Sequence, residues 1–158
     1  MIAPCRAVFD ANSLIANDVK QLTRSEAETE TLGRDFAGEL KAGDLVALHG
    51  PLGSGKTVFA RGVCLGLGCT VDAHSPSFNI VNFYPGKVEV AHIDLYRVDD
   101  DVQEIGWYDL LGSERVIIVE WADKAKKDLP PSRFDVFFVI VDSNRRQITI
   151  TKRNDPRH

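Results

Sequence analysis

The chain has 158 residues, and 19 Lys and Arg against 23 Asp and Glu give it a formal net charge of −4. This is about the length of one domain, and 44% hydrophobic with 27% charged residues is typical of a globular protein, which excludes disordered and fibrous classes. The acid surplus gives no general reason to bind nucleic acid, which proteins hold mainly through Lys and Arg, so we expect no direct DNA binding and, at most, an indirect role for RNA.

The cysteine count and the hydropathy pattern indicate a cytoplasmic protein. The three cysteines are odd in number and lack a C-x-x-C pair, which argues against a disulfide framework and against a zinc ribbon. No stretch approaches the roughly 18 consecutive apolar residues of a membrane span, and the first residues lack the pattern of a signal peptide. We expect no membrane contact, a leader at residues 1–20, a single domain at 21–152 and a polar tail at 153–158.

The first predicted elements are a helix, a strand and a second helix. Ser25 stands three residues before Glu28, as in a capping box, and the apolar positions that follow recur at every fourth residue until Gly43. The apolar run of residues 44–49 is typical of a buried parallel strand, and the apolar spacing over residues 58–67 predicts a helix. A glycine-rich turn connects this strand to the second helix.

The second half of the chain consists mainly of predicted strands. They cover residues 87–94, 116–119, 134–141 and 147–151, and the last two are arranged as a hairpin around residues 142–144. Late strands with no helix between them indicate antiparallel pairs added to a parallel core. We therefore expect an α/β fold with a mixed central sheet and helices on its faces.

The turn between the first strand and the second helix carries the strongest chemical signal. Gly50-Pro51-Leu52-Gly53-Ser54-Gly55-Lys56-Thr57 fits the pattern G-x-x-x-x-G-K-[ST] of a phosphate-binding loop. Its glycines let backbone N–H groups point at phosphate oxygens, and the helix that follows presents the positive end of its dipole to the same anion. Lys56 is placed to reach the β- and γ-phosphates, and Thr57 to bind Mg²⁺. The expected architecture is a P-loop NTPase-like three-layer α/β/α sandwich, with a parallel core and an antiparallel extension in its sheet.

Magnesium on such a loop needs a further acidic group, usually at the end of a buried strand. Asp94 ends the strand of residues 88–94, and Glu120 ends the run of residues 115–120. Arg97, three residues after Asp94, either contacts phosphate or pairs with a nearby acid. The guanine-specific pattern Asn-Lys-x-Asp is absent, which disfavours a GTPase.

Three further segments, taken with the loop, resemble in order and spacing the bacterial TsaE (YjeE) family of ATPases, which act in tRNA threonylcarbamoyladenosine (t6A) biosynthesis. The segments are Ser75-Pro76-Ser77-Phe78-Asn79-Ile80-Val81-Asn82, His92-Ile93-Asp94-Leu95-Tyr96-Arg97 and Ile118-Val119-Glu120-Trp121. The resemblance spans residues 22–151. It implies ATP and Mg²⁺ as cofactors, slow and partner-dependent ATP hydrolysis, and a function expressed through the TsaD and TsaB proteins, which modify adenosine 37 of tRNA.

The resemblance also implies a set of site residues. Lys56, Asp94 and Glu120 are the expected catalytic residues, with Asp94 ordering the attacking water or the water shell of the metal, and Thr57 and Glu120 are the expected magnesium ligands. The nucleotide is expected to contact Gly50, Gly53, Ser54, Gly55, Lys56, Thr57, Val58, Ser77, Arg97 and Trp121. Trp121 either lies beside the nucleotide or packs in the core. Residues near Ser25 and Arg145 are base-side candidates, although Arg145-Arg146 is more simply a solvated turn.

Two alternatives from other functional classes use the same loop. A small phosphotransferase would pass the γ-phosphate of ATP to a hydroxyl group of a metabolite or protein. A nucleotide-sensing adaptor would bind ATP or ADP without meaningful turnover. Labelled ATP separates the first alternative from an ATPase, and the addition of partners tests the second.

Overall fold

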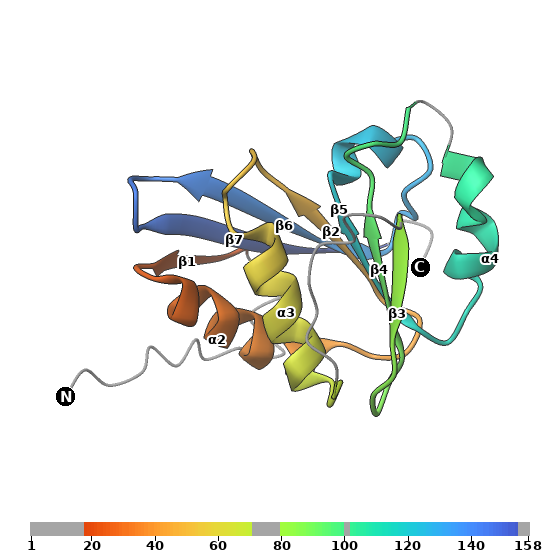
Figure 1. Ribbon diagram of the computed structural model, residues 1–158, viewed down its shortest axis with the longest axis horizontal. Coiled ribbons are helices and arrows are strands. Elements are labelled where there is room, and N and C mark those ends of the chain that lie inside the picture. Colours follow the sequence, from red (N-terminus) through yellow and green to blue (C-terminus); the bar gives the residue numbers. More distant parts are fainter. Residues whose placement is uncertain (1–17, 71–79, 100–101, 155–158) are drawn as a thin grey trace.

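The computed structural model of the chain describes residues 18–70, 80–99 and 102–154, and within them one seven-stranded sheet has helices on both faces (Figure 1). The strands are β1 (Val19–Thr23), β2 (Leu45–His49), β3 (Val81–Tyr84), β4 (Val90–Asp94), β5 (Val116–Glu120), β6 (Arg133–Ile140) and β7 (Arg146–Arg153). The helices are α2 (Glu26–Phe36), α3 (Lys56–Gly66) and α4 (Trp107–Leu111), with 3-10 segments η1 (Ala37–Glu39), η2 (Val102–Ile105) and η3 (Ala122–Ala125). None of the helices in these ranges is long and apolar enough to cross a membrane.

The strand order across the sheet is β1-β7-β6-β2-β5-β4-β3. The four central strands β6, β2, β5 and β4 are parallel to one another. Antiparallel strands extend this core on both sides, β7 and β1 next to β6 and β3 next to β4. The predicted mixed sheet with a parallel core is therefore confirmed, and so is the late hairpin, which β6 and β7 form.

The residue pattern does not predict the two edge strands. β1 brings Val19 and Lys20 into the sheet, although both lie in the range expected for the leader, because β1 pairs along its whole length with β7. β3 pairs with β4 from Val81 to Tyr84. Both edge strands are short and only partly apolar, so their extended form depends on backbone pairing with a neighbouring strand and not on a marked apolar alternation.

The first helix begins as predicted and ends earlier. Ser25 is its N-cap, and Ser25 Oγ accepts a hydrogen bond from the Glu28 N–H at 3.1 Å. The α-helical form ends at Phe36 and one 3-10 turn follows, so the helix does not extend to Gly43. A turn in which the Asp44 carboxylate accepts a hydrogen bond from the Lys41 N–H at 2.7 Å redirects the chain into β2.

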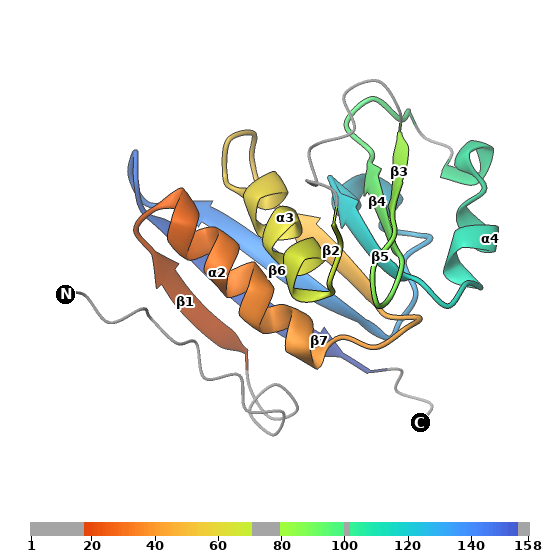
Figure 2. The same ribbon diagram turned by 60° about the horizontal axis from the view of Figure 1, so that its bottom comes forward.

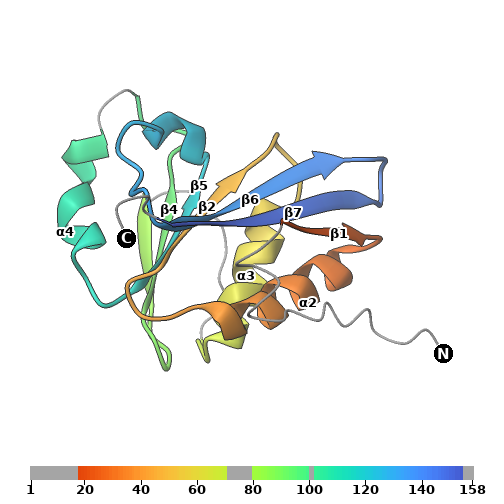
Figure 3. The ribbon, with the colours of Figure 1, turned by 180° about the vertical axis from the view of Figure 1, so that it is seen from behind.

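Two separate hydrophobic cores lie on the two faces of the sheet. On one face α2 and α3 pack against the strands, and Phe36, Phe59 and Val63 are fully buried there (Figure 2). On the other face α4, η2 and η3 cover β2, β4 and β5, with Trp107 at 0% exposure (Figure 3). Among the described residues, no side chain of β6 or β7 belongs to this second core. The predicted three-layer arrangement is confirmed, with a second helical layer that covers only part of the sheet.

The backbones of α2 and α3 touch through glycines. A Cβ atom added to Gly62 would lie 2.1 Å from the carbonyl oxygen of Glu30, and one added to Gly33 would lie 2.3 Å from that of Phe59. A Cβ on Gly66 would lie 2.5 Å from the Ala37 Cβ. Real Cβ atoms do not approach other atoms this closely, so the spacing of the two helices requires glycine at these positions.

Candidate nucleotide-binding site

The parallel core brings the predicted site residues to one edge of the sheet. β2, β4 and β5 run in the same direction, so their carboxyl ends meet, and in such sheets ligands bind outside those ends. The glycine-rich loop follows His49, the last residue of β2. Asp94 and Glu120 end β4 and β5 and are register partners on neighbouring strands. The topology therefore places both predicted carboxylates beside the loop.

The loop has the backbone form that its sequence predicts. Gly53 and Gly55 have φ values of 76° and 99°, in the left-handed region that favours glycine. Gly55 is the N-cap of α3, which begins at Lys56, so the predicted strand, turn and helix follow one another. The free N–H groups at this helix start, together with the helix dipole, form a site for an anion such as phosphate.

The nucleotide-binding residues expected on the loop are contiguous in the structure, from Gly50 to Val58 in the first turn of α3. Ser54 is 1% exposed, and its hydroxyl has no hydrogen-bond partner among the described residues. A buried polar atom normally has a partner. The loop therefore retains hydrogen-bonding capacity for a ligand.

Lys56 lies at the centre of the site. Its ammonium group donates hydrogen bonds to the carbonyl oxygens of Gly50 at 2.5 Å and Pro51 at 2.9 Å, and it lies 4.2 Å from the ring centre of Trp121. Burial lowers the pKa of Lys56, and the nearby carboxylates of Glu120, Asp94 and Asp123 oppose that effect. A partly desolvated cation surrounded by hydrogen-bond acceptors favours the approach of an anion.

Thr57 and Glu120, the two predicted magnesium ligands, are in direct contact. Thr57 Oγ1 donates a hydrogen bond to Glu120 Oε1 at 2.9 Å, and Glu120 is 3% exposed. Nowhere in the described ranges do three His, Cys, Asp or Glu side chains gather as a metal cluster. One hydroxyl and one or two carboxylates fit Mg²⁺ that is held mainly by phosphate oxygens and water. The donor set therefore fits this ion.

Asp94 and Trp121 flank this pair. Asp94 Oδ1 accepts a hydrogen bond from the Tyr96 N–H at 2.9 Å, which fixes the carboxylate at the strand end. Trp121 has φ 57° and ψ 42°, the one left-handed non-glycine residue in the described ranges. Its ring packs against the second core and also contacts Tyr96 and Lys56. The ring therefore contributes to core packing and also lies close to Lys56, and its contact with a nucleotide stays a prediction.

The structure shows no contact between the loop and most of the remaining predicted residues that it describes. Arg97 is exposed on the segment after β4, and Ser77 lies outside the described residues. Arg145 pairs with Asp142 in the β6–β7 turn. Arg146 donates hydrogen bonds to the carbonyl oxygens of Asp142 and Arg145 in the same turn, and also to the Gly53 carbonyl at 3.1 Å.

The sequence interpretation also missed two residues that shape the site. His92, quoted as part of the segment 92–97 but given no role, is fully buried with Nε2 at 2.6 Å from Glu120 Oε2. The period of two along the strand could have indicated it, because His92 and Asp94 share one face. Lys124 donates a hydrogen bond to the Tyr96 carbonyl at 2.5 Å, a contact between distant segments that no local pattern predicts.

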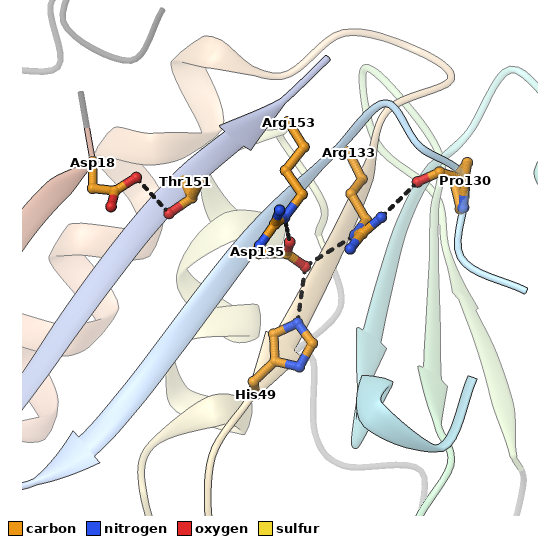
Figure 4. A network of polar contacts seen from close by, with 7 residues as sticks. All are labelled: Asp18, His49, Pro130, Arg133, Asp135, Thr151 and Arg153. Atoms are coloured by element: carbon orange, nitrogen blue, oxygen red, sulfur yellow. Dashed lines mark hydrogen bonds and ion pairs between the residues drawn. The ribbon is translucent and has the colours of Figure 1, made fainter. Parts of the chain in front are cut away.

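A second polar network lies on the part of the sheet, over β6 and β7, that the second helical layer leaves uncovered (Figure 4). Asp135 is 1% exposed, and its carboxylate accepts hydrogen bonds from His49 at 2.9 Å, from Arg133 at 3.1 Å and from Arg153. Burial raises the pKa of Asp135, but these hydrogen bonds outweigh that effect and lower it to about 2. The network fixes β2, β6 and β7 together at the residue directly before Gly50.

Comparison with known proteins finds matches to one protein family over most of the chain. The family model described as "Threonylcarbamoyl adenosine biosynthesis protein TsaE" matches residues 23–148. The tRNA threonylcarbamoyladenosine biosynthesis protein TsaE of Bacillus subtilis is 34% identical over 134 residues, which cover 84% of this chain and 85% of that protein. The protein of the same name from Treponema pallidum is 30% identical over 131 residues, which cover 82% of this chain and 97% of that one.

The fold agrees with a solved structure as well. The crystal structure of Bacillus subtilis YdiB superposes on this chain with a TM-score of 0.77 at 30% sequence identity, and the superposition covers 87% of each chain. The structural similarity thus covers most of the chain and is not confined to the loop.

Proposed function

This chain belongs to the TsaE family of threonylcarbamoyladenosine biosynthesis proteins, and on that premise we propose that it is a slow Mg²⁺-dependent ATPase of the tRNA t6A pathway. The observation that carries the proposal is the convergence of three groups at one edge of the sheet. Lys56 is buried against the loop, Thr57 opens α3, and the Glu120 carboxylate lies 2.9 Å from the Thr57 hydroxyl. Together they match what binding and hydrolysis of a nucleoside triphosphate requires.

Each residue has a task that its position supports. The loop N–H groups from Gly53 onward and the start of α3 bind the β- and γ-phosphates, and the Lys56 ammonium moves from the carbonyl oxygens of Gly50 and Pro51 to phosphate oxygens. Thr57 and Glu120 would hold Mg²⁺, which when bound neutralises charge on the phosphates. Asp94, fixed at the end of β4, would orient the attacking water through a hydrogen bond.

Membership of the family supports a proposal for the partners and the location. We place the protein in the cytoplasm with TsaD and TsaB as partners, and tRNA contacts it only indirectly. ATP hydrolysis would change the affinity for that complex, as in nucleotide switches generally. Ser77, Arg97 and the base-side candidates Ser25 and Arg145 remain predictions for the nucleotide complex.

The test is phosphate release from ATP and from GTP by the purified chain, alone and with TsaD and TsaB. We expect release from ATP that rises when the partners are added. Lys56→Ala should abolish it, whereas Lys126→Ala, an exposed lysine on the segment after η3, should leave it unchanged. If the partners change neither turnover nor nucleotide affinity, the t6A role is wrong. If labelled phosphate appears on an acceptor, the chain is a phosphotransferase.

Intrinsic fluorescence gives an independent measure of nucleotide binding. The chain has two tryptophans. Trp121 lies 4.2 Å from Lys56, whereas Trp107 is fully buried in the second core. We expect ATP to change the fluorescence of the wild type and of Trp107→Phe but not of Trp121→Phe. The same response in Trp121→Phe would contradict the position assigned to the nucleotide.

A further inference from the structure

His92 forms a buried pair with Glu120, one of the two proposed magnesium ligands. His92 is at 0% exposure in the middle of β4, and its Nε2 atom lies 2.6 Å from Glu120 Oε2. The other carboxylate oxygen, Oε1, accepts the hydrogen bond from Thr57. Three separate segments, α3, β5 and β4, thus meet on one carboxylate, and each of its oxygens has one donor among these contacts.

The partner of His92 identifies the donor in this contact. A carboxylate accepts hydrogen bonds, so we assign the hydrogen of this bond to His92 Nε2. His92 Nδ1 is buried and has no hydrogen-bond partner among the described residues. The bond to Glu120 is thus the polar contact that the structure shows for this ring. Fully burying an imidazole for shape alone would be unfavourable compared with an apolar side chain, which indicates that the hydrogen bond is the reason for histidine here.

The two contacts of Glu120 would differ in their relation to a bound metal ion. Mg²⁺ would be held on the side of Oε1 and the Thr57 hydroxyl, whereas the His92 bond to Oε2 lies on the other oxygen and needs no change when the metal binds. The His92 bond would therefore fix the plane of the carboxylate, whose terminal torsion has only a broad, roughly two-fold preference. Buried groups that orient a metal ligand in this way typically change metal affinity by about 10- to 100-fold when they are removed.

We propose that His92 is a positioning residue that holds the Glu120 carboxylate with Oε1 directed at Thr57 and the magnesium side of the site. The inference rests on the proposed function of this site. His92 acts through Glu120 and contacts neither the nucleotide nor the metal. Its effect should therefore appear in the Mg²⁺ dependence of nucleotide binding and not in the binding of nucleotide without metal.

The experiment measures ATP affinity by titration calorimetry, once with Mg²⁺ and once with EDTA. The Mg²⁺ enhancement is the affinity with Mg²⁺ divided by the affinity with EDTA. We expect His92→Phe, which keeps a ring but no donor, to lower the enhancement about tenfold while ATP affinity in EDTA stays within about twofold. His92→Gln, whose amide nitrogen can reach the position of Nε2, should restore most of the enhancement. His92→Asn, whose amide is too short to reach it, should behave like His92→Phe and serves if the phenylalanine variant does not fold.

A second histidine provides the matched control. His49 also bonds a buried carboxylate, that of Asp135 at 2.9 Å, but does not contact Glu120. His49→Phe should keep the Mg²⁺ enhancement. The proposal is overturned if both His92→Phe and His92→Asn keep the Mg²⁺ enhancement. It is also overturned if His92→Gln or His49→Phe loses as much of the enhancement as His92→Phe does. If the wild type shows no Mg²⁺ enhancement at all, the proposed function fails, and this inference fails with it.

Discussion

Replacing Asp135 with Asn should remove a stabilising contribution that depends on pH. The carboxylate is 1% exposed and accepts hydrogen bonds from His49, Arg133 and Arg153 (Figure 4). Although burial opposes it, this set lowers the pKa of Asp135 from its ordinary 3.8 to about 2. Because one pKa unit corresponds to about 1.4 kcal/mol, the ionised form contributes about 2 kcal/mol to the free energy of unfolding at neutral pH.

The sign of the pH dependence follows from the direction of the pKa shift. Between the folded and unfolded pKa values the unfolded chain binds more protons, so stability falls as the solution is acidified through this range. The contribution of Asp135 is complete above about pH 5, about half lost by pH 3, and gone below the folded pKa. Asp135→Asn has no such carboxylate, so its deficit relative to the wild type should shrink over the same range.

The assay is urea unfolding followed by tryptophan fluorescence from pH 7 to pH 3. Asp142→Asn is the matched control, because hydrogen bonds from Arg145 and Asn144 lower the pKa of Asp142 to about 2 as well, but this carboxylate is exposed in the β6–β7 turn. We expect little change in stability for the control, since solvent screens exposed pairs. The reasoning is refuted if Asp135→Asn is as stable as the wild type at pH 7, or if its deficit is the same at pH 3 as at pH 7.

Two further predictions concern packing. Gly62→Ala should lower the free energy of unfolding by about 1 to 3 kcal/mol in urea melts, because its Cβ would lie 2.1 Å from the Glu30 carbonyl oxygen. Gly38→Ala is the control and should not destabilise the protein, because nothing lies within 4 Å of the added Cβ. Equal losses in the two variants would contradict the reasoning. Burial raises the pKa of Cys64 to about 12 and also raises that of Cys69, so neither thiol should react quickly with a disulfide reagent at pH 8 until urea is added. If peptide mapping finds either cysteine labelled in the folded protein, the C-terminal end of α3 is open to solvent and the prediction is wrong.

The strand, loop and second helix could be predicted because several local signals agree there. An apolar run, a glycine-rich turn with Lys56 and Thr57, and a helical apolar spacing follow one another within the chain segment that forms them. The ends of β4 and β5 could be predicted for a similar reason, since Asp94 and Glu120 each close an apolar run. Their position at the same edge of the sheet as the loop then depended only on the parallel order of the strands.

What could not be predicted depends on contacts between distant segments. The extended form of β1 comes from pairing with β7, more than 120 residues later in the chain. The hydrogen bond between His49 and Asp135 joins residues 86 positions apart, and neither residue belongs to a local motif. The left-handed backbone of Trp121 could not be predicted either, because tryptophan has no intrinsic preference for that conformation and the surrounding packing imposes it.

The close approach of α2 and α3 limits how the site can respond to a ligand. With glycine at Gly33, Gly62 and Gly66, the two helix backbones are in contact, and no layer of side chains between them can rearrange to absorb a displacement. Since α3 begins at Lys56, a movement of the loop that shifts α3 carries α2 with it as one rigid body. The outer surface of α2, where the acidic residue Glu26 is exposed, is thereby mechanically coupled to the ligand that the loop binds.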